Sequence, residues 1–143
     1  MASDDERRAA WRELVETHGG LMDRLAAELQ AESGLPMTWY DVLLHLSDPP
    51  ASSMRMHELA DAVVISKSGL TRMVDRMEEE GLLAREAIPG DRRSIAIRLT
   101  PAGRRRFEEA RAVHRRGIRE HFSRHISEDE ARLLRELLGR LRG

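Results

Sequence analysis

The stretch SKSGLTRMVDRMEEEG, residues 66–81, decides how the rest of the chain is interpreted. Its hydrophobic residues recur at α-helical spacing and form one apolar face, made of Leu70, Met73, Val74 and Met77. Ser66 suits the N-cap of this helix, and Gly81 suits its C-terminal end. Basic and hydroxyl residues begin the helix and glutamates end it, which reverses the charge order that the helix dipole favours. Helix stability alone therefore does not explain this segment.

The exposed face of the same helix explains the charge order. The residues opposite the apolar face are Ser68, Thr71, Arg72 and Asp75, with Arg76 and Glu79 at the margins. A recognition helix points its N-terminal residues at base edges in the major groove, where arginine pairs with N7 and O6 of guanine. The C-terminal glutamates would then lie away from the phosphates. We predict DNA contacts from Lys67, Ser68, Thr71, Arg72 and Arg76.

The segment before residues 66–81 supplies the first helix of a helix-turn-helix. Residues 56–65, MHELADAVVI, have the pattern of a short amphipathic helix, followed at once by the Ser66 cap. Residues 49–53, PPASS, are expected to form a loop before it. Two helices joined by so short a turn are typical of DNA-binding helix-turn-helix motifs.

The segment after residues 66–81 predicts a wing of two antiparallel strands. LLARE, residues 82–86, is the expected partner of SIAIRLT, residues 94–100, and IPGDRR, residues 88–93, is the connecting turn. Alternate residues of the second strand form one face: Ile95, Ile97 and Leu99.

The tip of this wing carries charged residues that suit a minor groove. Arg92 and Arg93 place two guanidinium groups at the hairpin tip, and narrow minor grooves attract such groups. Asp91 is expected to pair with Arg93 and to fix the shape of the tip. Any single basic residue is also explained as a solvated surface charge, and we favour that explanation for Arg55 and Arg98. For the two tip arginines together with those of the helix, we favour DNA.

Further helices flank this central region. Apolar residues from about 9 to 32 lie on one helical stripe, which Gly19 and Gly20 interrupt. A close approach of another backbone, room for a ligand or loose local structure would each explain the glycine pair. A short helix over residues 39–48 is expected to be capped by Thr38.

Two helices are predicted after the wing. Thr100 and Pro101 mark the start of a long helix that reaches about His125. Ser127 and Glu130 form a capping box for the last helix. The fold class is therefore mainly α with a small antiparallel β-hairpin. Residues 36–100 are predicted to form the winged helix-turn-helix lobe, and residues 1–35 and 101–143 to form dimerisation helices.

Composition excludes several classes of function. The 143 residues fit one domain, and the net charge of −1 confines any nucleic-acid contact to a local patch. Cysteine is absent, and there is no glycine-rich phosphate loop, so we expect neither an enzyme nor a cofactor. The charged start, MASDDERRAAW, lacks the apolar region of a secretion signal, and no apolar run reaches membrane-spanning length. A cytoplasmic protein is expected.

Residues 56–105, which contain ELA, TRMVDRMEEEGLL, GDRRS and LTPAG, resemble the MarR family of bacterial transcriptional regulators. His57 departs from the pattern, since such proteins often place a Ser or Thr helix cap there. The resemblance implies an obligate homodimer with interlocking N- and C-terminal helices. It also implies a repressor or, less often, an activator, and many members release DNA on binding phenolic or aromatic-acid effectors.

The last helix supports the dimer independently. Its leucines form a stripe wider than a monomer core requires: Leu133, Leu134, Leu137, Leu138 and Leu141. Such a surface usually marks an interface. A two-fold dimer presents two recognition helices about 34 Å apart and so predicts a palindromic operator.

The resemblance places an effector between the dimerisation helices and the DNA-binding lobe. The residues expected to line this site are Trp11, Arg12, His18, Met22, Trp39, Tyr40, Leu43 and His114. An apolar wall with a cation suits an aromatic carboxylate, and Arg12 or His18 would supply the charge. The alternatives are that Trp11, Met22 and Leu43 are simple core residues and that Arg12 is a surface charge.

Two functions are alternatives to an effector-controlled DNA-binding regulator. His121 and His125 have metal-ligand spacing and share one side of their helix with His114, which allows a metal-responsive regulator. Interface histidines are the favoured interpretation, because no cysteine or well-placed carboxylate completes a site, and no metal ligand is predicted. The other alternative is a winged-helix module that binds protein instead of DNA.

Overall fold

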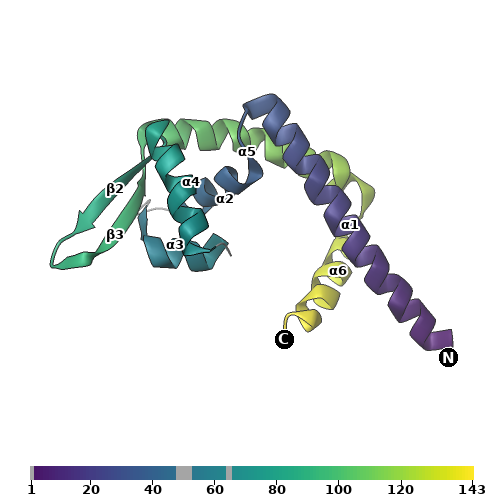
Figure 1. The fold of residues 1–143 in the computed structure, drawn as a ribbon. Coiled ribbons are helices and arrows are strands. Elements are labelled where there is room, and N and C mark those ends of the chain that lie inside the picture. Colours follow the sequence, from purple (N-terminus) through teal and green to yellow (C-terminus); the bar gives the residue numbers. More distant parts are fainter. Residues whose placement is uncertain (1, 48–52, 64–65) are drawn as a thin grey trace. The chain divides into compact units, whose positions relative to one another are not determined.

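The computed structural model describes residues 2–47, 53–63 and 66–143, apart from the side chains of Ala2, Ser3 and Lys67. The elements in chain order are α1 (Ala2–Ser33), α2 (Met37–Leu46), β1 (Ser53–Arg55), α3 (Met56–Val63), α4 (Lys67–Glu79), β2 (Leu83–Ile88), β3 (Asp91–Leu99), α5 (Pro101–His121), a short 3-10 helix η1 (Ser123–His125) and α6 (Glu128–Leu141) (Figure 1). The predicted fold class is confirmed, since helices dominate and the strands form one small antiparallel sheet. No helix in this described part is long and apolar enough to span a membrane.

The chain forms two compact units. One unit comprises Leu29–Ala112 and is called the winged unit below. The other comprises Met1–Glu28 and Val113–Gly143 and is called the terminal unit. Helices α1 and α5 contribute residues to both units.

The sheet of the winged unit contains one strand that the sequence does not predict. β1 pairs antiparallel with β3, which also pairs with β2, so the strand order is β1-β3-β2. Ser53, expected in the loop, lies opposite Arg98 instead, while residues 49–52 of that loop lie outside the described residues. A three-residue strand is stabilised by its distant partner and has no local signature of its own.

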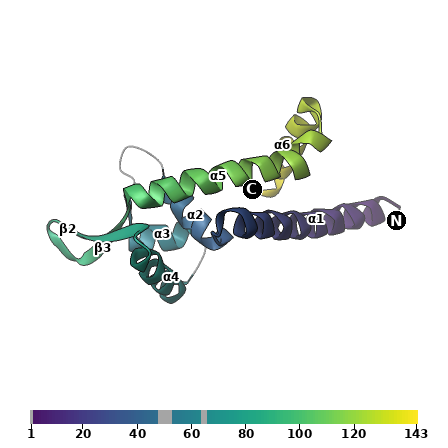
Figure 2. The same ribbon diagram turned by 90° about the horizontal axis from the view of Figure 1, so that it is seen from above.

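The wing is longer than predicted. β2 continues to Ile88 and β3 begins at Asp91, so only Pro89 and Gly90 remain between the strands. Gly90 has a φ of +83°, which a residue without a side chain adopts without strain. The predicted turn, residues 88–93, is therefore too long. The ends of both strands are exposed on both faces, so the sequence there lacks the alternation of apolar and polar residues that would predict a strand. The distal half of the hairpin projects beyond α3 and α4 (Figure 2).

The core of the winged unit fixes α4 against the sheet. Leu70, Val74 and Met77 of α4 are fully buried, as are Leu59 of α3 and Ile97 of β3. The same core contains Tyr40 stacked on Phe107, with ring centroids 5.5 Å apart. Ile95 shares the strand face predicted for Ile97 but is 43% exposed, because it lies nearer the tip, past the covering helices.

The ends of α4 follow the sequence prediction. The Ser66 hydroxyl accepts a hydrogen bond from the Gly69 N–H at 3.2 Å. At the other end, Gly81 has a φ of +78°, and the Leu82 N–H donates to the Met77 carbonyl at 2.9 Å. These bonds satisfy backbone groups that a helix end otherwise leaves unpaired. They fix where α4 begins and where the wing begins.

Three predictions about the other helices need correction. α1 begins at Ala2 and continues through Gly19 and Gly20, and in the described structure nothing lies within 4 Å of a side chain placed at either glycine. Thr38 is not the cap of α2, because the extended backbone of Pro36 takes the N-cap position and Thr38 falls in the first turn. α5 stops at His121, four residues earlier than expected, and a 3-10 turn follows.

The remaining caps are as predicted. The Gly103 N–H donates to the Thr100 hydroxyl at 3.0 Å at the start of α5. The capping box of α6 is complete, with Ser127 and Glu130 each accepting from the other's backbone N–H.

Candidate nucleic-acid interface

The exposed face of α4 has the composition that the sequence predicts. Ser68, Thr71, Arg72, Asp75 and Arg76 are all exposed, and the opposite face is buried in the core. Ser66 and Ser68 at the start of α4 are exposed, so their hydroxyl groups are accessible to another molecule. The side chain of Lys67 lies outside the described residues.

The arginines of α4 and of the three strands divide into two groups. Arg72, Arg76, Arg92 and Arg93 are exposed, and among the described residues none of them makes an ion pair. Three others are paired with carboxylates: Arg55, Arg85 and Arg98. An exposed arginine without an acidic partner is available for a phosphate or a base, and this group comprises the four predicted from the sequence.

Asp91 organises the tip of the wing, but through partners other than the one expected. Its carboxylate accepts from the Arg93 backbone N–H at 3.1 Å and from the Ser94 hydroxyl at 2.7 Å. Its ion pair is with Arg55, at 3.6 Å, and not with the Arg93 guanidinium. An aspartate readily bonds the backbone two residues on, and this compact arrangement leaves the Arg93 guanidinium free to project. The Ser94 hydroxyl and the Arg93 N–H hold the pKa of Asp91 below its usual value.

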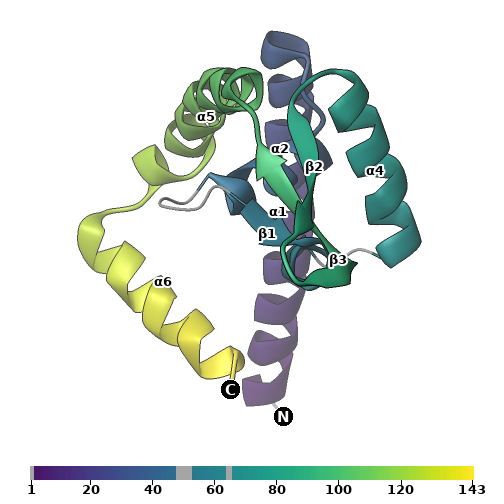
Figure 3. The same ribbon diagram turned by 90° about the vertical axis from the view of Figure 1, so that its left-hand side faces the viewer.

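Arg85 is a functional candidate that the sequence does not reveal. It lies on β2, and its guanidinium contacts α4, 2.5 Å from Asp75 Oδ1 and 2.9 Å from Glu78 Oε1. Its backbone N–H also donates to Glu78, at 3.0 Å. α4 runs alongside β2, which allows these contacts (Figure 3). The only signal in the sequence is a pair of acids three residues apart, Asp75 and Glu78, and such a pair names no partner.

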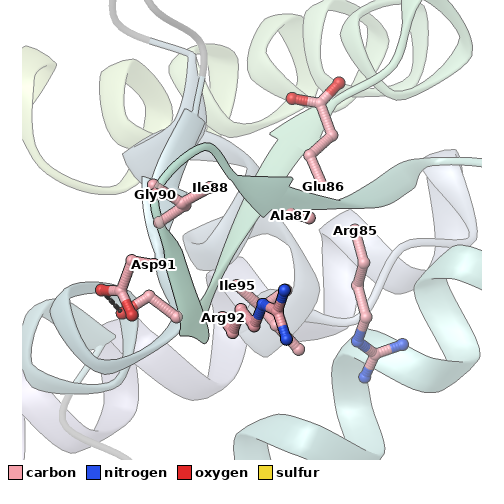
Figure 4. A pocket seen from close by; sticks show the side chains of 9 residues that line it. Arg85, Glu86, Ala87, Ile88, Gly90, Asp91, Arg92 and Ile95 are labelled. Carbon is pink, nitrogen blue, oxygen red and sulfur yellow. Dashed lines mark hydrogen bonds between the residues drawn. The ribbon is translucent and has the colours of Figure 1, made fainter.

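A hollow of about 570 Å³ follows the wing (Figure 4). Its lining comprises Arg85, Glu86, Ala87, Ile88, Gly90, Asp91, Arg92, Ser94 and Ile95. Arg92 lies beside Ile95, and Arg85 projects from the same side of the hairpin. The side of the wing next to α4 therefore combines an apolar floor with an exposed cation, which suits a sugar–phosphate chain.

The expected effector residues are divided between the two units. In the terminal unit, Trp11 is 66% exposed and Met22 is 39% exposed, and Arg12 and His18 of the same helix are exposed too. His114 is half-buried there, and burial lowers its pKa.

In the winged unit, α2 carries the other three. Trp39 is half-buried, whereas Tyr40 and Leu43 are buried in the core, Tyr40 through its stacking on Phe107. For Leu43 the structure supports the alternative of a core residue.

His121 and His125, which have metal-ligand spacing, each lie next to an oxygen atom of the protein. His121 Nε2 lies 2.5 Å from Glu28 Oε1, and His125 Nε2 lies 3.1 Å from the Glu120 carbonyl. In the part of the chain that the structure describes, no three histidines or acids are grouped to hold a metal ion. The metal-responsive alternative thus gains no support from these residues.

The fold and this face define the class of protein. A helix-turn-helix with an adjacent antiparallel wing, both carrying exposed arginines, is the arrangement of winged helix-turn-helix DNA-binding proteins. A family model described as MarR family matches residues 33–94. The HTH-type transcriptional regulator PecS of Dickeya dadantii (strain 3937) is 34% identical over 128 residues, which cover 85% of this chain and 73% of that protein.

Solved structures agree with this relationship. AbsC, a MarR family transcriptional regulator from Streptomyces coelicolor, is 32% identical with a TM-score of 0.88, over 96% of this chain and 92% of that one. Sco3205, a regulator of the same family and organism solved in complex with DNA, is 29% identical with a TM-score of 0.87, over 95% and 86% of the two chains. The chain therefore belongs to the MarR family of transcriptional regulators, which is a family of regulators and not of enzymes.

Proposed function

We propose that the protein is a sequence-specific repressor that binds a palindromic operator as a homodimer in the cytoplasm. The observation that carries this proposal is the set of four exposed arginines without acidic partners, two on α4 and two at the wing tip. Hydroxyl and arginine side chains at the start of α4 suit base edges in the major groove. The tip arginines suit the neighbouring minor groove. The DNA complex of the related Sco3205 supports the same use of this fold.

The homodimer is supported by the apolar surface of the terminal unit. α6 has no buried residue, and Leu133, Leu137 and Leu141 are 55%, 44% and 71% exposed. On α1, Trp11 is 66% and Val15 49% exposed. Large apolar side chains exposed on two helices are typical of an interface, and a second copy of the chain would cover them. A two-fold arrangement then demands two half-sites of inverted sequence.

The proposal extends to an effector that is an aromatic carboxylate or phenol. Exposed Arg12 and His18 on α1 would supply the cation, and the indole ring of Trp11 on the same helix would supply apolar surface. Benzoate is a suitable first probe. It should release operator DNA from the wild type, and Arg12→Ala should require a higher concentration. Release that is equal for both proteins, or no release at all, contradicts this assignment.

The DNA-binding proposal is tested by selecting DNA fragments with the purified full-length protein. We expect an inverted repeat, and a log K that falls steeply as log salt rises because several phosphates are contacted. Arg72→Ala should relax preference at one base position, whereas Arg140→Ala, which removes the same charge from an α6 arginine paired with Glu136, should leave the preference unchanged. A flat salt dependence with no selected repeat would support the protein-binding alternative.

Repression is tested separately. A reporter gene whose promoter overlaps the selected repeat should be transcribed less when the protein is present. Increased transcription would assign an activator.

A further inference from the structure

The distal half of the wing has little apolar packing to hold it in place. Ile97 and Leu99 at the base of β3 are buried, but Ile95 is 43% exposed and its cross-strand neighbour Ala87 is exposed as well. The distal end of the hairpin projects past α3 and α4 (Figures 1 and 2). The orientation of the tip arginines relative to α4 must therefore depend on polar contacts.

Arg85 provides the strongest of these polar contacts. Its side chain is 24% exposed, and it reaches from β2 to two carboxylates on successive turns of α4, Asp75 and Glu78. The Glu78 carboxylate also accepts from the Arg85 backbone N–H, so this acid holds both the strand and the side chain. A planar guanidinium with two carboxylates is a directional link, whereas a single surface ion pair is weak.

Arg55 provides a second contact, nearer the tip. Its guanidinium lies 3.6 Å from Asp91 Oδ2 and 4.0 Å from Glu58 Oε1 of α3. Since Asp91 also binds the Arg93 backbone and the Ser94 hydroxyl, this contact connects the tip to the start of α3. These two distances are longer than the 2.5 and 2.9 Å of the Arg85 ion pairs, so the contact is weaker than that of Arg85.

We propose that Arg85 is a positioning residue that sets the angle of the wing against α4, so that the tip arginines reach the minor groove while α4 occupies the major groove, with Arg55 as a second and weaker tie. The proposal rests on the DNA-binding function proposed above. Arg85 does not itself need to touch DNA, because two carboxylates already engage its guanidinium.

The hairpin contains a matched control. Arg98 Nε donates to Glu86 at 2.6 Å, and both residues belong to the wing itself. Arg98→Gln therefore removes the same charge and a similar ion pair without cutting a link between the wing and a helix.

The experiment compares footprints of the full-length protein on its selected operator. For Arg85→Gln we expect about tenfold weaker binding. At saturating protein the guanine protections in the major groove persist, and the hydroxyl-radical protections under the wing are lost. The salt slope should fall by about 2, since two tip arginines leave the phosphates. Arg55→Gln should weaken the wing protections partly, and Arg98→Gln should leave them intact.

A second variant separates positioning from charge shielding. Arg85→Gln leaves two acids unpaired on α4, and these alone would repel DNA. The triple variant Asp75→Asn, Glu78→Gln, Arg85→Gln removes both the cation and the acids. If Arg85 positions the wing, this variant still lacks the wing protections, whereas restored wing protections would overturn the proposal. Unchanged wing protections in Arg85→Gln would also overturn it.

The footprint of the wild type distinguishes a failure of the positioning proposal from a failure of the proposed DNA-binding function. A wild type that protects no operator sequence refutes DNA binding itself. Circular dichroism and the thermal unfolding midpoint of each variant confirm that a lost protection comes from a folded protein.

Discussion

The winged unit and the terminal unit differ in how they bury hydrophobic surface. The winged unit has its own core, and its exposed large hydrophobic residues are Leu44 and Ile95, as far as the chain is described. The terminal unit buries Leu25 but exposes Trp11, Leu14, Val15, Met22, Phe122, Leu133, Leu137 and Leu141. One unit therefore has a complete core within one chain, whereas the other leaves a large apolar surface exposed, which the proposed dimer would cover.

The largest expected effect comes from charging the surface of α6. Leu133→Asp with Leu137→Asp should give a folded monomer, because both residues are exposed in the single chain and the carboxylates would be buried in a dimer. Loss of simultaneous binding to two half-sites should reduce operator affinity by about 10²-fold or more. Sedimentation velocity and a titration with operator DNA measure the two effects.

The control for this variant is Arg135→Asp, which places a carboxylate at an exposed position about opposite Leu133 and Leu137 on α6. It should remain dimeric. A leucine variant that stays dimeric, or a monomer that still binds tightly, would show that the exposed apolar surface serves another purpose.

The second effect concerns the core of the winged unit. Leu70→Ala should lower the free energy of unfolding by about 2–5 kcal/mol, because the side chain is fully buried and a cavity replaces it. The dimer dissociation constant should not change. Leu137→Ala should show the opposite pattern, with weaker dimers and little cost to the winged unit. Urea unfolding and sedimentation of both variants measure this, and equal effects on both quantities would contradict the division of roles.

A smaller effect separates what the start of α4 contributes to protein stability from what it contributes to DNA recognition. Ser66→Ala removes the N-cap of α4 and should cost about 1 kcal/mol of stability. Ser68→Ala removes an exposed hydroxyl and should cost little stability, while operator affinity falls. Thermal unfolding and DNA binding of the two variants provide the measurement. A large stability loss in Ser68→Ala would mean that its hydroxyl serves the fold.

The smallest effect is a pH dependence from His114. Burial lowers the pKa of His114 below its ordinary value of 6.5, so the unfolded chain takes up this proton more readily than the folded one. The contribution of this group to stability should therefore decline as pH falls through about 6.5 and level off below the folded pKa. Urea unfolding of the wild type and of His114→Gln from pH 8 to 5 isolates the contribution of His114 to the free energy of unfolding. Parallel curves would show that His114 titrates normally.

Local signals account for what the sequence predicts well. The two faces of α4, the Ser66 and Ser127 caps and the Gly81 terminus depend on neighbours within a few residues, and periodicity and capping preferences encode such features. The exposed Arg72 follows from the same local geometry.

The features that the sequence does not predict depend on distant partners. β1 exists because Ser53–Arg55 pairs with residues 96–98, and no signal within three residues specifies that pairing. Arg85 looks like an ordinary strand residue until α4 is placed beside it. Asp91 is correctly expected to shape the wing tip, but its choice among the Arg93 guanidinium, the Arg93 backbone and Arg55 depends on the fold of the hairpin.

The most direct test of the account is methylation protection of guanines by the wild-type protein on its selected operator. We predict two protected major-groove segments related by inversion, with centres about one helical turn, or about 34 Å, apart. Both should disappear together with Leu133→Asp and Leu137→Asp. A single protected segment, or two that persist in the monomeric variant, would contradict a paired chain that inserts two copies of α4 into successive major grooves.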